Sequence, residues 1–397
     1  MAAPWRPGVT AVTPLPWWSL WTPSTPRGRV GAGPATCGPA GRNLADVPTT
    51  TQPDWLPRDL VDLEAVAGWG RGAGLPGGPV SAVERIGGGT QNVVLRLDWG
   101  GRDLVLRRPP EHPRPASNAT LAREMRVLSA LAGADVPHPG FVAGCTDESV
   151  LGVVFYLMEA VDGDNPGATV GALYRDDAAA RAAAATDTAT ALARLAAVDH
   201  EAIGLGDLGR PDGFLERQVP RWLDHLASYD RIPEYGGNRL PHVPELARWL
   251  EAHRPPPSPP GLVHGDYHLN NVLLDPVRPR VAAIVDWEMC TVGDPLLDLG
   301  WLLVTWPDGG PDPLTGAALA AAGGLPGRDE LVGAWADAGD REPSAVDWYT
   351  VLAGFKFAIV IEGTHARALA GQADPDVGQH LHDAAVRTLE RVAPLAR

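Results

Sequence analysis

Hydrophobic and polar residues alternate in the first half of the chain in a way that predicts paired β-strands. Val93, Leu95 and Leu97 alternate with polar residues, a Gly100-Gly101 pair follows, and a second apolar run ends at Arg107. Alternation with a period of two indicates a half-buried strand, and a two-residue glycine connection is typical of a tight hairpin. We therefore expect an antiparallel hairpin here. Other elements expected in this half are helices at about 57–67 and 117–132 and a strand at 152–158.

Beyond Asp162 the pattern predicts a chain that is mostly helical. Two short strands interrupt it within 262–286, split by a turn at Asp275-Pro276. A proline-rich stretch at 255–260 forms a stiff connector that leads into these strands. The expected helices include the alanine-rich run 176–198 and the segments 294–306 and 344–371.

The beginning of the chain differs from the rest in composition. The first 50 residues contain 9 Pro, 6 Gly and a single acidic residue, Asp46, and prolines interrupt their one apolar run. A segment of this kind buries too little apolar surface to offset the entropy of ordering it. We therefore expect a disordered extension at 1–55, a small β-rich region at 56–160 and a larger helical region at 161–397, which together form an α+β architecture.

The composition excludes several classes of function. Lys356 is the single lysine among 33 basic residues, so a Walker A loop with its Gly-Lys-Ser/Thr sequence is missing and Schiff-base chemistry would depend on Lys356 alone. A net charge of −15 disfavours a nucleic-acid partner. The chain contains no run of 18 apolar residues, so no membrane partner is expected. Three widely spaced cysteines favour a reduced, cytoplasmic compartment over a disulfide framework.

One segment carries the groups that phosphoryl transfer requires. His264-Gly265-Asp266 is followed by Asn271, and Asp286 stands at the end of an apolar strand twenty residues after Asp266. Transfer of a phosphoryl group from ATP needs a carboxylate that accepts the proton of the attacking hydroxyl and oxygen ligands for Mg²⁺. Asp266 can serve as the base, and Asn271 and Asp286 can hold the metal, because their spacing matches the kinase catalytic loop and the metal-binding aspartate that follows it.

This segment resembles the HGDxxxxN motif of the phosphotransferase family that contains aminoglycoside phosphotransferases and choline kinases. More narrowly, Asp286-Trp287-Glu288-Met289, Gly293-Asp294-Pro295 and Gly354-Phe355-Lys356 resemble the kinase domain found fused to acyl-CoA dehydrogenases. The resemblance covers about residues 57–392. It implies a bilobed, protein-kinase-like fold with a small antiparallel-sheet N-lobe and a mainly helical C-lobe, and an ATP- and Mg²⁺-dependent enzyme acting on a small-molecule hydroxyl.

The resemblance gives expected roles to residues of the first half. Gly87-Gly88-Gly89 precedes the first hairpin strand and would cover the phosphates of ATP, although a glycine triplet alone is also a common plain turn. Arg107 takes the place of the phosphate-pairing lysine of kinases. Glu124 lies in the apolar stripe of its helix, and an inward charge requires a partner, so we expect an ion pair with Arg107. Backbone atoms of the segment 159–161, among them those of Glu159 and Val161, would contact the adenine.

Other residues of the second half have structural or acceptor-binding roles in this interpretation. We expect His264 to brace the catalytic loop and Asp298, placed among large apolar residues, to form hydrogen bonds with it. Asp294 with Pro295 reads as the start of a helix. Residues that are candidates for an acceptor pocket are His268, Glu288 and Lys356. Lys356 is also open to a second interpretation, that of a structural lysine whose charged end reaches water.

Several questions stay open at the level of sequence. A non-catalytic nucleotide-binding module on the same fold is an alternative, because arginine replaces the lysine at 107. A metal-dependent hydrolase built on His264, Asp266 and His268 is a further one. The acceptor is either a hydroxyacyl-CoA-like metabolite or an aminoglycoside-like compound, two classes of opposite charge. The pattern does not distinguish ATP from GTP, and it gives no oligomeric state.

Overall fold

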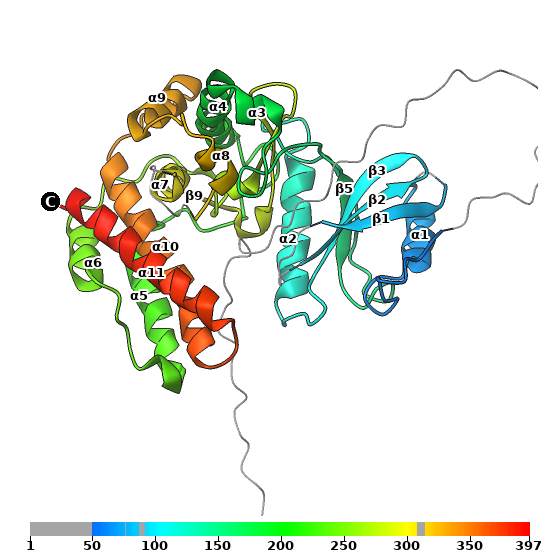
Figure 1. Cartoon of the computed structure of the whole chain (residues 1–397), viewed down its shortest axis with the longest axis horizontal. Helices are drawn as coiled ribbons and strands as arrows, with labels where there is room; N and C mark the ends of the chain where they lie inside the picture. The colour runs from blue at the N-terminus through cyan, green and yellow to red at the C-terminus, as the bar shows by residue number, and fades with distance from the viewer. Residues whose placement is uncertain (1–49, 76, 87–91, 308–313) are drawn as a thin grey trace, which may run out of the picture.

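The computed structural model describes residues 50–75, 77–86, 92–307 and 314–397. Most of the expected extension and the glycine triplet Gly87-Gly88-Gly89 lie outside these ranges. Two lobes stand side by side, a sheet at one end and a larger group of helices at the other (Figure 1). The fold class expected from the sequence, α+β with an antiparallel sheet in the first lobe and helices in the second, is therefore confirmed.

The N-lobe is built on a five-stranded antiparallel sheet in the order β1-β2-β3-β5-β4. The predicted hairpin is present, with Trp99 paired to Arg102 across Gly100 and Gly101, whose φ angles are +59° and +86°. A two-residue turn of this kind needs left-handed backbone, which glycine adopts without strain. The strands are β1 (Val80–Arg85), β2 (Val93–Trp99), β3 (Arg102–Arg108), β4 (Phe141–Cys145) and β5 (Phe155–Glu159).

Two helices accompany the sheet. Helix α1 (Leu63–Gly72) shares an apolar core with buried residues from all five strands, whereas α2 (Ser117–Ala130) lies on the side of the C-lobe (Figure 1). The sequence predicted the first helix too early, at 57–67. The Asp62 side chain accepts hydrogen bonds from the backbone of Glu64 and Ala65, and this cap fixes the start of the helix at Leu63. The strand expected at 152–158 begins only at Phe155.

The C-lobe consists of helices around two small antiparallel ribbons, β6 with β9 and β7 with β8. The expected pair of strands around Asp275-Pro276 corresponds to β7 and β8. The ribbon strands are β6 (Gly261–Val263), β7 (Val272–Leu274), β8 (Val281–Ile284) and β9 (Thr291–Gly293). The α-helices are α3 (Ala172–Asp176), α4 (Ala178–Ala197), α5 (Gln218–Ser228), α6 (Val243–Ala252), α7 (Leu296–Thr305), α8 (Ala317–Ala321), α9 (Arg328–Ala338), α10 (Val346–Leu369) and α11 (Pro375–Val392). Short 3-10 turns are η1 (Tyr229–Arg231), η2 (Pro233–Tyr235), η3 (Leu269–Asn271), η4 (Trp287–Met289) and η5 (Ala393–Leu395).

Helix α10 is the centre of the C-lobe. It packs against both α7 and α11, and nearly all of its residues from Trp348 to Thr364 are buried. At the start of α7, the carboxylate of Asp294 accepts hydrogen bonds from the Leu296 N–H and the Tyr349 hydroxyl, so the capping predicted for Asp294 also ties α7 to α10. No helix among the described residues is long and apolar enough to cross a membrane.

Candidate active site

The segment between β6 and η3 is held in place by α7. The carboxylate of Asp298 accepts hydrogen bonds from the backbone N–H groups of His264 and Gly265, and the His264 Nε2 lies 3.1 Å from the Val285 carbonyl oxygen. Gly265 has a φ of +88°, and a Cβ there would lie 2.7 Å from the Met289 carbonyl oxygen. The hydrogen bonds expected of His264 and Asp298 are thus present, and they fix the loop that carries Asp266.

Asp266 is oriented by three side chains. Its Oδ1 accepts a hydrogen bond from the Trp301 Nε1 at 3.1 Å and lies 3.3 Å from the His268 Nε2, and its Oδ2 accepts from the Asn271 Nδ2 at 3.3 Å. Burial alone would raise the pKa of Asp266, but the neighbouring His268, His264 and Lys356 outweigh it and hold the pKa below its ordinary value. A carboxylate that is ionised and fixed in this way can accept a proton.

Asn271 lies beside Asp266, and its backbone is hydrogen-bonded to the residue before Asp286. The Asn271 Nδ2 also donates to the Asp266 carbonyl at 2.8 Å, and the Asn271 carbonyl accepts from the Val285 N–H at 2.9 Å, directly before Asp286. The Oδ1 of Asn271 is buried and has no hydrogen-bond partner among the described residues. Asp286 has a φ of +68°, in the left-handed region that residues other than glycine adopt infrequently. The backbone therefore turns sharply where the carboxylate is placed.

Arg107 lies at the centre of three carboxylates. Its Nε is 3.1 Å from Glu124, and its Nη2 is 2.9 Å from Asp286 and 3.6 Å from Glu288. The predicted ion pair between Arg107 and Glu124 is confirmed, and the side chains of both are less than 10% exposed. Glu124 additionally accepts a hydrogen bond from the Trp287 N–H, which joins α2 to the segment that carries Asp286.

Carboxyl groups outnumber cations around Arg107. One guanidinium faces the three carboxyl groups of Glu124, Asp286 and Glu288, and burial together with the charge of Asp286 raises the pKa of Glu288 to about 8, so this group is largely protonated near neutral pH while no cation is bound. Oxygen ligands in excess of the local cations are the environment that a hard divalent cation such as Mg²⁺ requires. The carboxylate of Asp286 and the unpartnered oxygen of Asn271 are suitable ligands.

Lys356 of α10 points into the same region from the C-lobe. Its side chain is buried, and its Nζ lies 3.4 Å from the Gly265 carbonyl oxygen and 4.6 and 5.5 Å from the ring centres of Trp301 and Trp222. Burial lowers the pKa of Lys356 to about 8, against the attraction of Asp298 and Asp266. This lysine does not extend to bulk water, so the interpretation of it as a snorkelling residue is wrong.

A cavity of about 900 Å³ adjoins the catalytic loop. It extends from Gly265, Glu288 and Lys356 to α5 and the loop before it. Both signs of charge line it. The basic lining residues are Arg123, Arg210, Arg217, Arg221 and Lys356, and the acidic ones are Asp207, Glu216, Asp224 and Glu288. Its other walls are Leu208, Gly209, Phe214, Gln218, Pro220, Trp222, Val263, Gly265, Met289, Thr291 and Leu297.

The candidate residues divide according to their positions. Glu288 and Lys356 line the cavity, whereas His268 is fully buried against Asp266 and is not part of the lining. His268 therefore exposes no atom to the cavity in this structure, and its predicted role in an acceptor pocket stays a prediction. Glu159 ends β5, with its side chain largely exposed and 3.8 Å from Arg102, and Val161 follows in the connection between the lobes.

Some residues of the site had weak signals in the sequence. Trp301 and Trp222 contact Lys356, and a tryptophan in an apolar helix gives no indication of such a role. Arg217, the N-cap residue of α5, and Arg221 within α5 are four positions apart, and this spacing could have indicated a basic surface on one face of the helix. Arg123 precedes Glu124 on α2 and donates to the carbonyls of Leu208 and Cys290, a contact that only the folded chain reveals.

The chain was compared with known proteins. Residues 82–333 match the sequence model of the phosphotransferase enzyme family. Acyl-CoA dehydrogenase family member 11 of Gallus gallus is 30% identical over 317 residues, which are 76% of this chain and 39% of that protein. Family member 10 of Mus musculus is 28% identical over 301 residues, 73% of this chain and 27% of that protein. The chain thus spans about two fifths or less of the length of these relatives.

Among solved structures, a candidate aminoglycoside phosphotransferase from Ralstonia eutropha JMP134 superimposes with a TM-score of 0.68 at 30% identity. The match covers 84% of this chain and 98% of that one. Family model, relatives and solved structure agree with the fold described above and with the resemblance seen in the sequence. The chain therefore belongs to the phosphotransferase enzyme family and has a protein-kinase-like fold.

Proposed function

We propose that the chain transfers the γ-phosphoryl group of ATP to a hydroxyl of a small molecule, with Asp266 as the base and Asn271 and Asp286 as ligands of Mg²⁺. The observation that carries this proposal is the approach of two segments, the loop of Asp266 and Asn271 and the end of β8 that leads to Asp286. Asp266 and Asn271 are joined by hydrogen bonds of 2.8 and 3.3 Å, and the Val285 N–H bonds to Asn271 immediately before Asp286.

The proposed magnesium site fits the residues present. Asn271 offers a buried oxygen with no other partner in the described part of the chain, and Asp286 offers a carboxylate from a left-handed backbone position. When bound, Mg²⁺ neutralises charge on the β- and γ-phosphates. Arg107, fixed by Glu124, would contact the phosphates. The backbone of Glu159–Val161 would contact the adenine, and Gly87-Gly88-Gly89, outside the described residues, would cover the phosphates.

The protein's own groups then have defined tasks. Trp301 and His268 hold the Asp266 carboxylate in one orientation, and its depressed pKa keeps it ionised and able to take the proton of the acceptor hydroxyl. The loop that carries it is braced by Asp298. No covalent intermediate on the protein is required, because positioning and charge stabilisation account for most of the catalysis in this type of reaction.

The charges of the cavity favour an anionic acceptor. Among the described residues, none of Arg123, Arg210, Arg217 and Arg221 forms an ion pair with a carboxylate, whereas two of the four acidic lining residues are paired elsewhere. Asp207 pairs with Arg126, and Glu288 lies beside Arg107. Arginine binds phosphate and carboxylate groups through its forked donors.

A hydroxyacyl-CoA-like acceptor satisfies this requirement and an aminoglycoside-like acceptor, which is cationic, does not. The relatives named as members of the acyl-CoA dehydrogenase family support the same choice. We therefore propose a hydroxylated acyl-CoA or a similar anionic metabolite as the substrate class.

The test compares Asp266→Ala with the wild type and with Asp230→Ala, a control at an exposed aspartate in η1. Each protein is incubated with Mg²⁺, γ-labelled ATP and a panel that contains a hydroxyacyl-CoA, its free hydroxy acid and an aminoglycoside. We expect the Asp266 variant to lose about 10³-fold or more in kcat while calorimetry still detects ATP binding. Undiminished turnover by Asp266→Ala would refute the assignment of the base.

A second candidate function is a nucleotide-binding module without turnover. It is favoured by the contact between the Arg107 Nη2 and the Asp286 Oδ1 at 2.9 Å, which places a cation beside the proposed metal ligand. Saturable binding of ATP with no labelled product and no ADP from any acceptor of the panel would support this alternative.

A further inference from the structure

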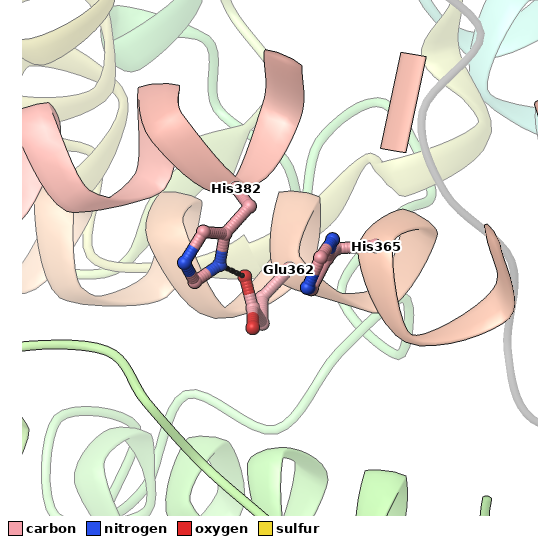
Figure 2. Close-up of side chains that lie close together, drawn as sticks. All are labelled: Glu362, His365 and His382. Carbon is pink, nitrogen blue, oxygen red and sulfur yellow. Dashed lines mark hydrogen bonds and ion pairs between the residues drawn. The ribbon is translucent and has the colours of Figure 1, made fainter. Parts of the chain in front are cut away.

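A second cluster of possible metal ligands lies on the other side of α10. Glu362 and His365 of α10 and His382 of α11 each offer one ligand atom, and these atoms lie within 4.8 Å of one another. Figure 2 shows the Glu362 carboxylate between the two imidazoles, with a hydrogen bond to His382. In the described part of the chain this is the one group of three or more His, Cys, Asp or Glu side chains that meets this distance.

The cluster is arranged by the helices that carry it. Glu362 and His365 are separated by three positions, so they share one face of α10, and His382 projects from α11 onto that face (Figure 2). The imidazole rings of His365 and His382 are stacked, with centres 4.5 Å apart. Their ring nitrogens can therefore turn toward one point beside the Glu362 carboxylate.

The surrounding groups hold the ligands in the manner of an outer coordination shell. The Tyr235 hydroxyl donates to the Glu362 Oε1 at 3.0 Å, which leaves Oε2 toward His382 at 2.7 Å. His365 has a hydrogen bond to the backbone of Gly378. Hydrogen bonds of this kind orient the ligands of protein metal sites, because they fix the carboxylate rotamer and the tautomer of each histidine.

Charge gives a separate reason to expect a cation here. Glu362 is fully buried, and among the described residues it forms no ion pair with a lysine or an arginine. A buried carboxylate is stable when a cation or several hydrogen-bond donors compensate its charge. His382 and Tyr235 provide part of this compensation, and a divalent cation would provide all of it.

We propose that Glu362, His365 and His382 bind a divalent transition-metal ion, with Zn²⁺ as the best match. Two imidazoles and one carboxylate are a common ligand set for Zn²⁺ and leave a fourth position for water. That position is accessible because both histidines are only partly buried. Ligands of a tetrahedral zinc site lie about 3.4 Å apart, so small rotations of the imidazoles complete the geometry.

The proposed zinc site is distinct from the proposed phosphotransfer site. Lys356, which lines the acceptor cavity, and Glu362 are six residues apart on α10, about 9 Å along the helix axis, and point in different directions. The ion would connect α10, α11 and the turn that carries Tyr235. Nitrogen ligands favour zinc over magnesium, so the two sites would select different metals.

The site also differs from the hydrolase centre considered at the level of sequence. His264, Asp266 and His268 form no group of three ligand atoms within 4.8 Å among the described residues, and His264 is hydrogen-bonded to Val285. Zinc found in the purified protein would therefore be attributed to Glu362, His365 and His382.

The experiment titrates Zn²⁺ into the full chain after treatment with EDTA and dialysis, with Mg²⁺ in excess throughout so that zinc does not enter the magnesium site. Affinity is measured by competition with a chromogenic chelator. We expect one equivalent of Zn²⁺ for the wild type, and an affinity lower by about 100-fold or more for His365→Ala and for His382→Ala. His380→Ala, at an exposed histidine on the same helix as His382, is the matched control and should bind as the wild type does.

Two further measurements keep the proposal testable if an alanine variant folds poorly. Glu362→Gln preserves the size and the hydrogen-bonding capacity of the side chain and should also weaken zinc binding. Co²⁺ in place of Zn²⁺ should give the visible absorption of a tetrahedral site, absent in His382→Ala. The proposal is overturned if the wild type binds no equivalent of Zn²⁺, or if His365→Ala or His382→Ala binds it with wild-type affinity.

Discussion

The cluster around Arg107 and the cavity beside α5 both contain arginine and acidic residues, but they use them differently. Arg107 is less than 10% exposed and contacts Glu124, Asp286 and Glu288 within 3.6 Å. The arginines of the cavity have no carboxylate partner among the described residues, and Arg210, Arg217 and Arg221 are exposed. One region holds its charges in fixed pairs, and the other has arginines that lack carboxylate partners in the described structure and are available, in our proposal, to an anionic ligand.

This difference corresponds to two requirements of phosphoryl transfer. In the proposed reaction the groups at the phosphate must be fixed before the substrate arrives, and buried contacts of α2 and β3 fix the residues proposed for this task. The acceptor must enter and leave, which exposed side chains permit. Lys356 lies where the two regions meet, beside Gly265 and on the wall of the cavity.

The largest effect on stability is expected from removing the central arginine. Arg107→Ala leaves the buried Glu124 without its cation and should lower the free energy of unfolding by about 3 to 5 kcal/mol. The control is Arg96→Ala, which removes surface ion pairs with Asp103 and Asp162 and should lower it by about 1 kcal/mol or less. Urea denaturation measures both. Equal losses in the two variants would contradict the contrast between fixed and exposed charges.

A smaller effect, dependent on pH, is expected from Lys356. Because its pKa is about 8 in the folded protein and about 10.4 in the unfolded chain, the unfolded chain binds more protons between these values. Stability therefore rises with pH in this window. Relative to Lys356→Met, the wild type should gain about 2 to 3 kcal/mol in the free energy of unfolding between pH 7 and pH 10. A pH-independent difference between the two proteins would show that Lys356 is not held in a desolvated position.

The smallest effect concerns the arginines of the cavity. Arg210→Glu and Arg221→Glu should each raise KM for an anionic acceptor by about 10-fold, equivalent to about 1.4 kcal/mol, with kcat nearly unchanged. Arg239→Glu, at an exposed position outside the lining, is the control. Steady-state kinetics with varied acceptor provides the measurement. The opposite result would contradict the proposed substrate class. In that case the wild type phosphorylates a cationic acceptor efficiently, and the two arginine variants have a lower KM for that acceptor than the wild type has.

The sequence predicted those parts of the fold whose signals are local. The β2–β3 hairpin and the inward position of Glu124 each follow from a few neighbouring residues, and the placement of Asp298 among large apolar residues predicted that it accepts hydrogen bonds from the loop of Asp266. The spacing of five positions also predicted that Asp266 and Asn271 lie close together, and their side chains are hydrogen-bonded. The predicted functions of these residues stay predictions, since hydrogen bonds and distances do not measure turnover.

Other features depend on contacts between distant segments. Strand β1 was not predicted, and its pairing with β2 includes a register shift between Ser81 and Glu84 that no local pattern encodes. The contacts of Arg107 with Asp286 and Glu288 span about 180 positions. His382 meets Glu362 only because α10 and α11 pack together, so Glu-x-x-His on α10 alone was an insufficient signal.

The position of Lys356 makes it a natural chemical handle. It is the one side-chain amine in 397 residues, it lines the cavity, and its lowered pKa of about 8 leaves about a tenth of it unprotonated at pH 7. Amine-directed reagents small enough to enter the cavity should therefore modify this side chain as well as the α-amino group. An isotope-labelled methyl group introduced at Lys356 would give a magnetic resonance signal from within the cavity, and protection of the amine by an acceptor would report occupancy of the site without any enzymatic assay.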